Sequence, residues 1–94
     1  MDTSPAAHPL EAATLPELLR LQIAHEHPTG TIASVARYIG IKEPTLYSWC
    51  ADIGAAGSRI PEPATIKDVL RQLNAAPEVV DHALRLWAAA KGAA

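Results

Sequence analysis

The stretch TIASVARYIGIKEPTLYSWC, residues 31–50, contains the residues that decide the fold. Its first half repeats apolar side chains at helical spacing, and these are Ile32, Val35, Ala36 and Ile39. Thr31 can cap the start of this helix, and Gly40 can end it because glycine adopts a positive φ without strain. The chain from Thr31 onward therefore predicts two short helices, residues 32–39 and 43–53, joined by a tight turn.

Two helices joined by so tight a turn must cross closely, and close crossing requires small residues. Ala36 supplies one in the middle of the first helix. Leu46 and Trp49 lie on one side of the second helix, where they can lock the pair onto the rest of the domain. Together with Gly40, these residues specify how the helices are arranged and say little about a ligand.

The rest of the chain predicts three more helices. Thr14 can cap a first helix, and apolar residues at intervals of three and four predict helices over residues 65–74 and 77–91. Residues 1–13 are rich in Ala, Pro, Ser and Thr without a periodic apolar face, which predicts a flexible arm or a loosely docked tail. No stretch alternates like a strand, so we expect one all-α domain of five helices over residues 14–92.

With this order of helices, TIASVARYIGIKEPTLYSW resembles the helix-turn-helix of the Cro/phage-repressor family, and it is also similar to the related unit of transposase-type proteins. The resemblance extends over about residues 14–90 and includes SRIPEPATIKDVLRQLN and the last helix. It implies a compact, lambda-repressor-like domain. Residues 32–39 would then be the scaffold helix, and residues 43–53 the recognition helix that enters the major groove of DNA.

The resemblance also implies which residues contact DNA. The groove-facing positions would be Lys42, Glu43, Pro44, Tyr47, Ser48 and Ala51. Contacts to the phosphate backbone would come from Thr31, Arg37, Ser58 and Arg59. Lys42 could bind a guanine edge or a phosphate, and Glu43 could accept a hydrogen bond from the amino group of cytosine. Arginine and glutamine, common base readers in this family, are missing from this face, so a monomer should bind weakly.

The distribution of charge is more informative than the formal net charge of −2. Residues 29–60 carry more basic than acidic side chains, namely Arg37, Lys42 and Arg59 against Glu43 and Asp52. The acidic excess lies in residues 1–28, and residues 61–94 are balanced. The negative sum argues weakly against nonspecific binding of polyanions, whereas the central stretch is compatible with a DNA-facing surface.

The last predicted helix has more apolar surface than one core-facing stripe requires. Its apolar residues are Val79, Val80, Ala83, Leu84, Leu86 and Trp87. The surplus predicts a homodimer interface through Val80, Leu84 and Trp87, which would double the contacts to a two-fold operator. The alternative is that this helix simply closes a very small core.

Several kinds of function find no support in the sequence. Cys50 is the only cysteine, which excludes an internal disulfide and a multi-cysteine zinc site. His25 and His27, two residues apart, would point to different sides of a helix, so we expect no metal site. No catalytic motif or phosphate-binding glycine loop is present, so we expect no enzyme, cofactor or small-molecule substrate. Without a bilayer-spanning apolar stretch or a signal peptide, a cytoplasmic protein is expected.

The sequence and the resemblance together predict a sequence-specific DNA-binding transcription regulator. It would be a small prokaryotic or phage repressor that acts as a homodimer by occupying a promoter. Two alternatives stay open. The helix-turn-helix fold could be used as a protein-interaction module, which the negative charge favours, or the chain could be the DNA-recognition component of a recombination or packaging complex.

Overall fold

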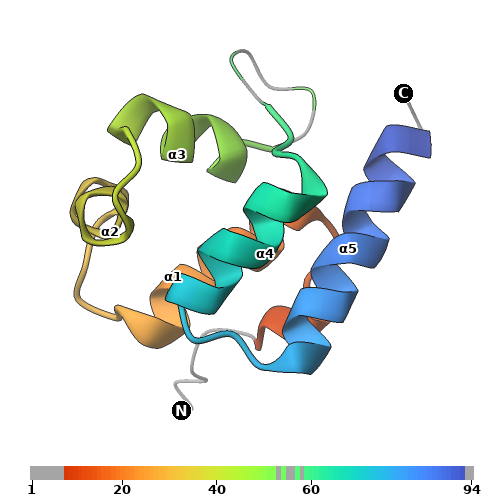
Figure 1. Cartoon of the computed structure of the whole chain (residues 1–94), viewed down its shortest axis with the longest axis horizontal. Coiled ribbons are helices and arrows are strands. Elements are labelled where there is room, and N and C mark those ends of the chain that lie inside the picture. Colours follow the sequence, from red (N-terminus) through yellow and green to blue (C-terminus); the bar gives the residue numbers. More distant parts are fainter. Residues whose placement is uncertain (1–7, 53, 55–56, 58, 93–94) are drawn as a thin grey trace, which may run out of the picture.

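The computed structural model describes residues 8–52, 54, 57 and 59–92, and it contains five α-helices and one short 3-10 helix (Figure 1). In chain order these are η1 (Pro9–Glu11), α1 (Leu15–Glu26), α2 (Ile32–Ile39), α3 (Glu43–Cys50), α4 (Pro63–Gln72) and α5 (Pro77–Gly92). Within the described ranges no residue belongs to a strand. The predicted all-α class with five helices is confirmed.

The helices are arranged so that α2 and α3 lie toward one end of the molecule and α5 at the other, with α1 and α4 between them (Figure 1). α1 contacts η1, α3 and α5, whereas α2 packs against α3 and α4 packs against α5. α1 is therefore the element that joins the two ends. None of the described helices combines the length and the apolar content needed to span a bilayer.

The core is built almost entirely from aliphatic side chains. The fully buried large residues include Leu15, Leu18, Leu19, Leu46, Ile66, Leu70 and Leu73. α1 contributes more of these than any other helix, which agrees with its central place. Trp49 and Trp87 are only partly buried and pack at the margin of the core. The aromatic rings therefore border the surfaces of α3 and α5 that the sequence associates with function.

The first helix begins where the sequence predicts. The amide of Glu17 donates to Thr14 Oγ1 at 3.3 Å, and the amide of Ala13 donates to Glu17 Oε1 at 2.8 Å. Both bonds satisfy amides that the helix itself leaves without a carbonyl partner. The reciprocal bond comes from Ala13 rather than from the cap residue Thr14, so the arrangement is a capping box displaced by one residue.

Residues 8–13, predicted as part of a flexible arm or a loosely docked tail, pack against the helices. Pro9 and Ala12 are buried, and His82 Nε2 donates to the carbonyl oxygen of Ala12 at 2.9 Å. η1 thereby packs against both α1 and α5. A single turn of 3-10 helix has no apolar periodicity, which is why the sequence pattern misses it. Residues 1–7 of the predicted arm lie outside the described residues.

The ends of three predicted helices also differ. The recognition helix was predicted over residues 43–53 but ends at Cys50, because Ala51 turns to an extended conformation with φ −77° and ψ 143°. The helix predicted over residues 65–74 is shifted toward the N-terminus: it starts at Pro63, since proline fits the first turn of a helix, and ends at Gln72. The last helix, predicted over residues 77–91, extends one residue further.

Candidate nucleic-acid interface

The start of α2 is fixed by Thr31 and Ser34. The amide of Ser34 donates to Thr31 Oγ1 at 3.1 Å, and the amide of Thr31 donates to Ser34 Oγ at 2.9 Å. Ser34 Oγ in turn donates to the carbonyl oxygen of Thr31 at 3.0 Å. These bonds use the amide of Thr31 and the hydroxyl proton of Ser34. The hydroxyl proton of Thr31 and the amides of Ile32 and Ala33, in the first helical turn, have no intrahelical partner and could bind an anion.

The turn between α2 and α3 depends on Gly40. Its φ of 78° lies in the left-handed region, as the sequence predicts for the end of this helix. The amide of Gly40 donates to Arg37 O at 3.3 Å, and the amide of Ile41 donates to Ala36 O at 2.9 Å. Apart from Gly40 and its two chain neighbours, no heavy atom lies within 4 Å of the place where a Cβ would stand at Gly40. The requirement for glycine therefore comes from the backbone conformation and not from crowding.

Two of the predicted structural residues, Ala36 and Leu46, hold α2 against α3. Their exposed fractions are 1% and 0%. The small side chain of Ala36 permits close approach, and Leu46 anchors α3 in the core. Trp49 is half-buried and packs against the edge of the core. The two helices are thus held by aliphatic contacts, and the outer side of α3 stays uncovered.

The uncovered side of α3 contains most of the predicted groove-facing residues. Lys42, Glu43, Pro44 and Tyr47 are exposed, with 51% of Tyr47 accessible. Lys42 is the N-cap residue and makes no side-chain capping bond. A cation, a carboxylate, a proline ring and a phenol therefore stand together on the first turns of an eight-residue helix. Such a set can offer both donors and acceptors to an external ligand.

Ser48 is more restricted than its sequence position indicates. It is half-buried, and its Oγ donates to the carbonyl oxygen of Pro44 at 3.0 Å. Because the single hydroxyl proton is used in this bond, Ser48 can accept a hydrogen bond from a ligand but cannot donate one in this rotamer. An acceptor fits the amino group of a base and does not fit a phosphate oxygen.

Ala51, predicted as a groove-facing position of the recognition helix, lies outside α3. It follows the last helical residue, Cys50, in an extended conformation and is half-buried. A residue beyond the helix end cannot continue the exposed row formed by the earlier turns. Ser58, predicted to contact the DNA backbone, lies outside the described residues.

Arg20 on α1 binds the C-terminal end of α3. Arg20 Nη1 donates to the carbonyl oxygen of Cys50 at 2.5 Å and lies 3.0 Å from Asp52 Oδ1. This contact could not be predicted from the sequence, because Arg20 and Cys50 are 30 residues apart and no local pattern links them. A positive charge at this position also compensates the negative end of the helix dipole. Arg20 therefore ties the orientation of α3 to the central helix.

The thiol of Cys50 is a packing group. Its residue is buried, and burial raises the pKa of the thiol to about 11, although the nearby Arg20 guanidinium acts in the opposite direction. The thiol is therefore protonated near neutral pH. A buried, neutral thiol is neither a good nucleophile nor a ready metal ligand, so Cys50 contributes to the core side of α3 and not to its outer side.

A shallow hollow of about 420 Å³ lies beside the exposed row of α3, and it is lined by Pro44, Thr45, Ser48, Trp49 and Arg59. The amide of Arg59 donates to the carbonyl oxygen of Ser48 at 3.1 Å, which holds the end of the following loop against the helix. Thr45 and Trp49 are not among the site residues predicted from the sequence. Helical spacing from Pro44 and Ser48 would have indicated that Thr45 and Trp49 follow on the adjacent flank.

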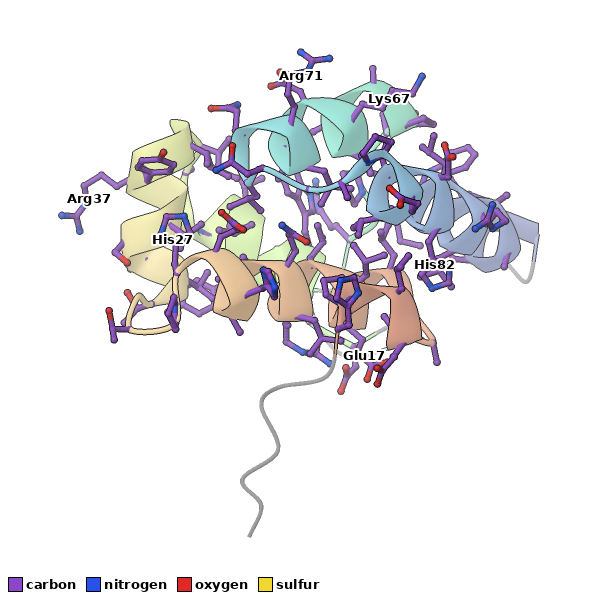
Figure 2. All side chains as sticks on the ribbon, turned by 90° about the horizontal axis from the view of Figure 1, so that it is seen from below. Glu17, His27, Arg37, Lys67, Arg71 and His82 are labelled. Atoms are coloured by element: carbon purple, nitrogen blue, oxygen red, sulfur yellow. The ribbon has the colours of Figure 1, made fainter. Side chains whose placement is uncertain are left out.

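The predicted cations lie on the elements that border this face. Arg37 is exposed on α2 and points away from the body of the molecule in Figure 2. Lys42 and Arg59 are exposed at the start of α3 and beside its hollow. Glu43 is the acidic residue of the exposed row, and Asp52 is paired with Arg20. The described part of α2, α3 and the following loop is therefore more basic than the chain as a whole.

Comparisons of the chain with protein-family models, with curated proteins and with solved structures give no match. The class of site is therefore defined by geometry alone. An all-α domain presents a short helix, crossed closely by a second one, with polar and charged side chains on its open side.

Proposed function

We propose that the chain is a sequence-specific double-stranded-DNA-binding protein of the helix-turn-helix type, lambda-repressor-like, that regulates transcription as a small phage or prokaryotic repressor by occupying a promoter. The observation that supports this proposal most directly is the open row of Lys42, Glu43, Pro44 and Tyr47 on α3. A helix with its side chains is about 10–12 Å across, and the major groove is about 12 Å wide. α3 can therefore enter the groove while α2 lies across its edge.

The residues divide into two roles in this proposal. Lys42, Glu43 and Tyr47 would contact base edges, where Lys42 suits guanine and Glu43 suits the amino group of cytosine. Ser48 would accept from a base amino group, since its proton is directed at Pro44. These contacts differ from one base pair to another, so they would provide the sequence preference.

Contacts to the phosphate backbone would come from the flanks. The free hydroxyl proton of Thr31 and the first amides of α2 suit a phosphate oxygen, and Arg37 and Arg59 add positive charge on the two sides of α3. The number of cations is small and the formal net charge is −2. Affinity should therefore be modest, fall with salt, and benefit from a homodimer formed through Val80, Leu84 and Trp87 on α5.

The test is selection of binding sites from a pool of random double-stranded DNA at low salt, followed by sequencing of the retained fragments. We expect enrichment of a short motif, which is lost when Lys42 is changed to Ala. The matched control is Lys67→Ala, which removes an exposed cation from α4 and should leave the motif unchanged. If the folded wild-type protein retained fragments without any common motif, sequence-specific binding would be rejected.

A second candidate function is a protein-interaction module with the same fold. Exposed aromatic rings favour it, since 51% of Tyr47 on α3 and 65% of Tyr38 on α2 are accessible. The rings of His27 and Tyr38 also lie in a T-shaped arrangement, with 5.1 Å between their centroids. Tyrosine is common in protein interfaces. The DNA selection distinguishes the two functions, because an interaction module would retain no enriched motif. Enrichment of one short operator would also favour a repressor over a component of a recombination or packaging complex.

A further inference from the structure

α5 has one side that no other described helix covers. It lies at the edge of the molecule in Figure 1 and also in Figure 2, where the chain is turned by 90°. Val80, Leu84 and Trp87 are partly buried by the core and partly open on this side. Val80 and Leu84 are followed at the same spacing by Ala88, which is exposed. Val80, Leu84 and Ala88 therefore form one ridge along α5, with Leu84 at its centre.

The charges of α5 are separated along its length. The acidic residues Glu78 and Asp81 lie in the first half, and the basic residues Arg85 and Lys91 lie in the second half. All four are exposed. Within the described chain, Glu78, Asp81 and Arg85 take part in no ion pair or hydrogen bond that would occupy them, whereas Lys91 Nζ lies 5.9 Å from the centroid of the Trp87 ring. The first half of the helix is thus complementary in charge to the second half.

We propose that α5 pairs with α5 of a second copy of this chain, antiparallel, about a two-fold axis at Leu84. Reversing one helix about Leu84 superimposes the ridge on itself, so that Val80 meets the partner's Ala88 and Leu84 meets the partner's Leu84. The same reversal places Asp81 on the same side of the ridge as the partner's Arg85, about 3 Å away along the helix axis. The inference rests on the proposed function, because a two-fold operator requires a homodimer. It names the partner, a second copy of the chain, and the orientation of the two α5 helices.

Charge selects the antiparallel orientation over the parallel one. In a parallel pair, Asp81 would lie beside the partner's Asp81 and Arg85 beside the partner's Arg85, so that like charges would repel at both positions. Exposed ion pairs contribute little attraction, so the charges determine orientation and the ridge supplies the association. Because Val80, Leu84 and Trp87 are already partly covered by the core, the dimer is expected to be weak and dependent on concentration.

The test is sedimentation equilibrium in the absence of DNA on wild type, Asp81→Arg and Arg85→Asp. Each single variant places like charges opposite each other, so its dimer dissociation constant should rise at least about tenfold. In an equimolar mixture the two variants carry opposite charges at the facing positions and should form a heterodimer about as tight as the wild-type dimer. Asp68→Arg on α4, an exposed position with the same change of charge, is the control and should leave association unchanged.

Three results would overturn the inference. One is a wild-type protein that stays monomeric up to about 1 mM. Another is a mixture of the two variants that associates no better than either alone. The third is preferential pairing of wild type with the double variant Asp81→Arg/Arg85→Asp, which would indicate a parallel pair. DNA selection is scored separately, so a dimer that binds no DNA would reject the proposed function, whereas a DNA-binding monomer would reject the helix pair.

Discussion

Arg20 on α1 reaches the last carbonyl group of α3, that of Cys50, with a separation of 2.5 Å between its Nη1 and the oxygen, and the same guanidinium pairs with Asp52 at 3.0 Å. α3 ends without a glycine cap, since Ala51 turns directly into an extended conformation. Arg20 therefore takes the place of a local C-cap. The end of the proposed recognition helix depends in this way on a side chain from the centre of the fold.

Changing Arg20 to Met should loosen the end of α3 more than the rest of the molecule. The substitution leaves the Cys50 carbonyl without its charged donor, and we expect it to lower the free energy of unfolding by about 1 kcal/mol, since the site is partly open to solvent. Hydrogen exchange should show faster exchange in the last turn of α3 than in α5. Arg71→Met is the control, because Arg71 makes only a 3.8 Å ion pair with Asp68 on the surface. Equal loss of protection in α3 and α5 would contradict a local role.

The buried thiol of Cys50 predicts a specific dependence of stability on pH. Its pKa is raised from 9.0 to about 11 in the folded chain, chiefly by desolvation. Between these values the unfolded chain binds fewer protons than the folded chain, so stability is constant below pH 9 with respect to this group and falls as pH rises toward 11. The loss should not exceed about 3 kcal/mol. Urea unfolding of wild type at a series of pH values measures it.

The control for this pH dependence is Cys50→Ala, in which the other titrating groups remain. The difference in free energy of unfolding between wild type and the variant should be constant below pH 9 and should shift against wild type above it. A difference that stays constant up to pH 11 would show that the thiol does not titrate as its burial requires.

The indole N–H group of Trp87 is a buried hydrogen-bond donor. Its Nε1 is enclosed and has no hydrogen-bond partner among the described residues. An enclosed donor without a partner destabilises the folded state by roughly 1–3 kcal/mol, so its removal should offset part of the loss of ring contacts. We expect Trp87→Phe to cost about 1 kcal/mol less than Trp49→Phe, a second partly buried tryptophan. Thermal and urea unfolding compare the two variants, and equal costs would contradict the prediction.

The sequence predicts the fold best where a residue's requirement is local. Gly40 needs only its own positive φ, and Ala36 and Leu46 need only helical spacing to lie on the packed side. η1 could not be predicted, because Pro9 and Ala12 become buried only through contacts with distant helices. The predicted ends of the helices differ from the observed ones for the same reason, because contacts with distant residues also determine where a helix ends.

For the candidate site as well, local features could be predicted from the sequence and tertiary contacts could not. The exposure of Lys42, Glu43 and Tyr47 follows from the period of the helix once Leu46 is placed in the core. Local spacing does not show that the Ser48 proton is directed at Pro44 O, because this depends on the rotamer. The contact of Arg20 with Cys50 O depends on how α1 crosses α3, which is a tertiary relationship.

Tyr47 offers the most direct check on the proposed DNA contact. If its ring or hydroxyl group touches a base edge, Tyr47→Ala should weaken binding to the selected operator by roughly 1–3 kcal/mol and reduce the preference for that sequence. Because 51% of the residue is exposed, the free energy of unfolding should change little. Tyr38→Ala is the matched control, since Tyr38 is a tyrosine of 65% exposure on α2, outside the open row of α3. Fluorescence anisotropy with operator and scrambled duplexes measures both variants. Equal losses for the two tyrosines, or a loss that accompanies unfolding, would mean that the open row of α3 is not the surface that reads DNA.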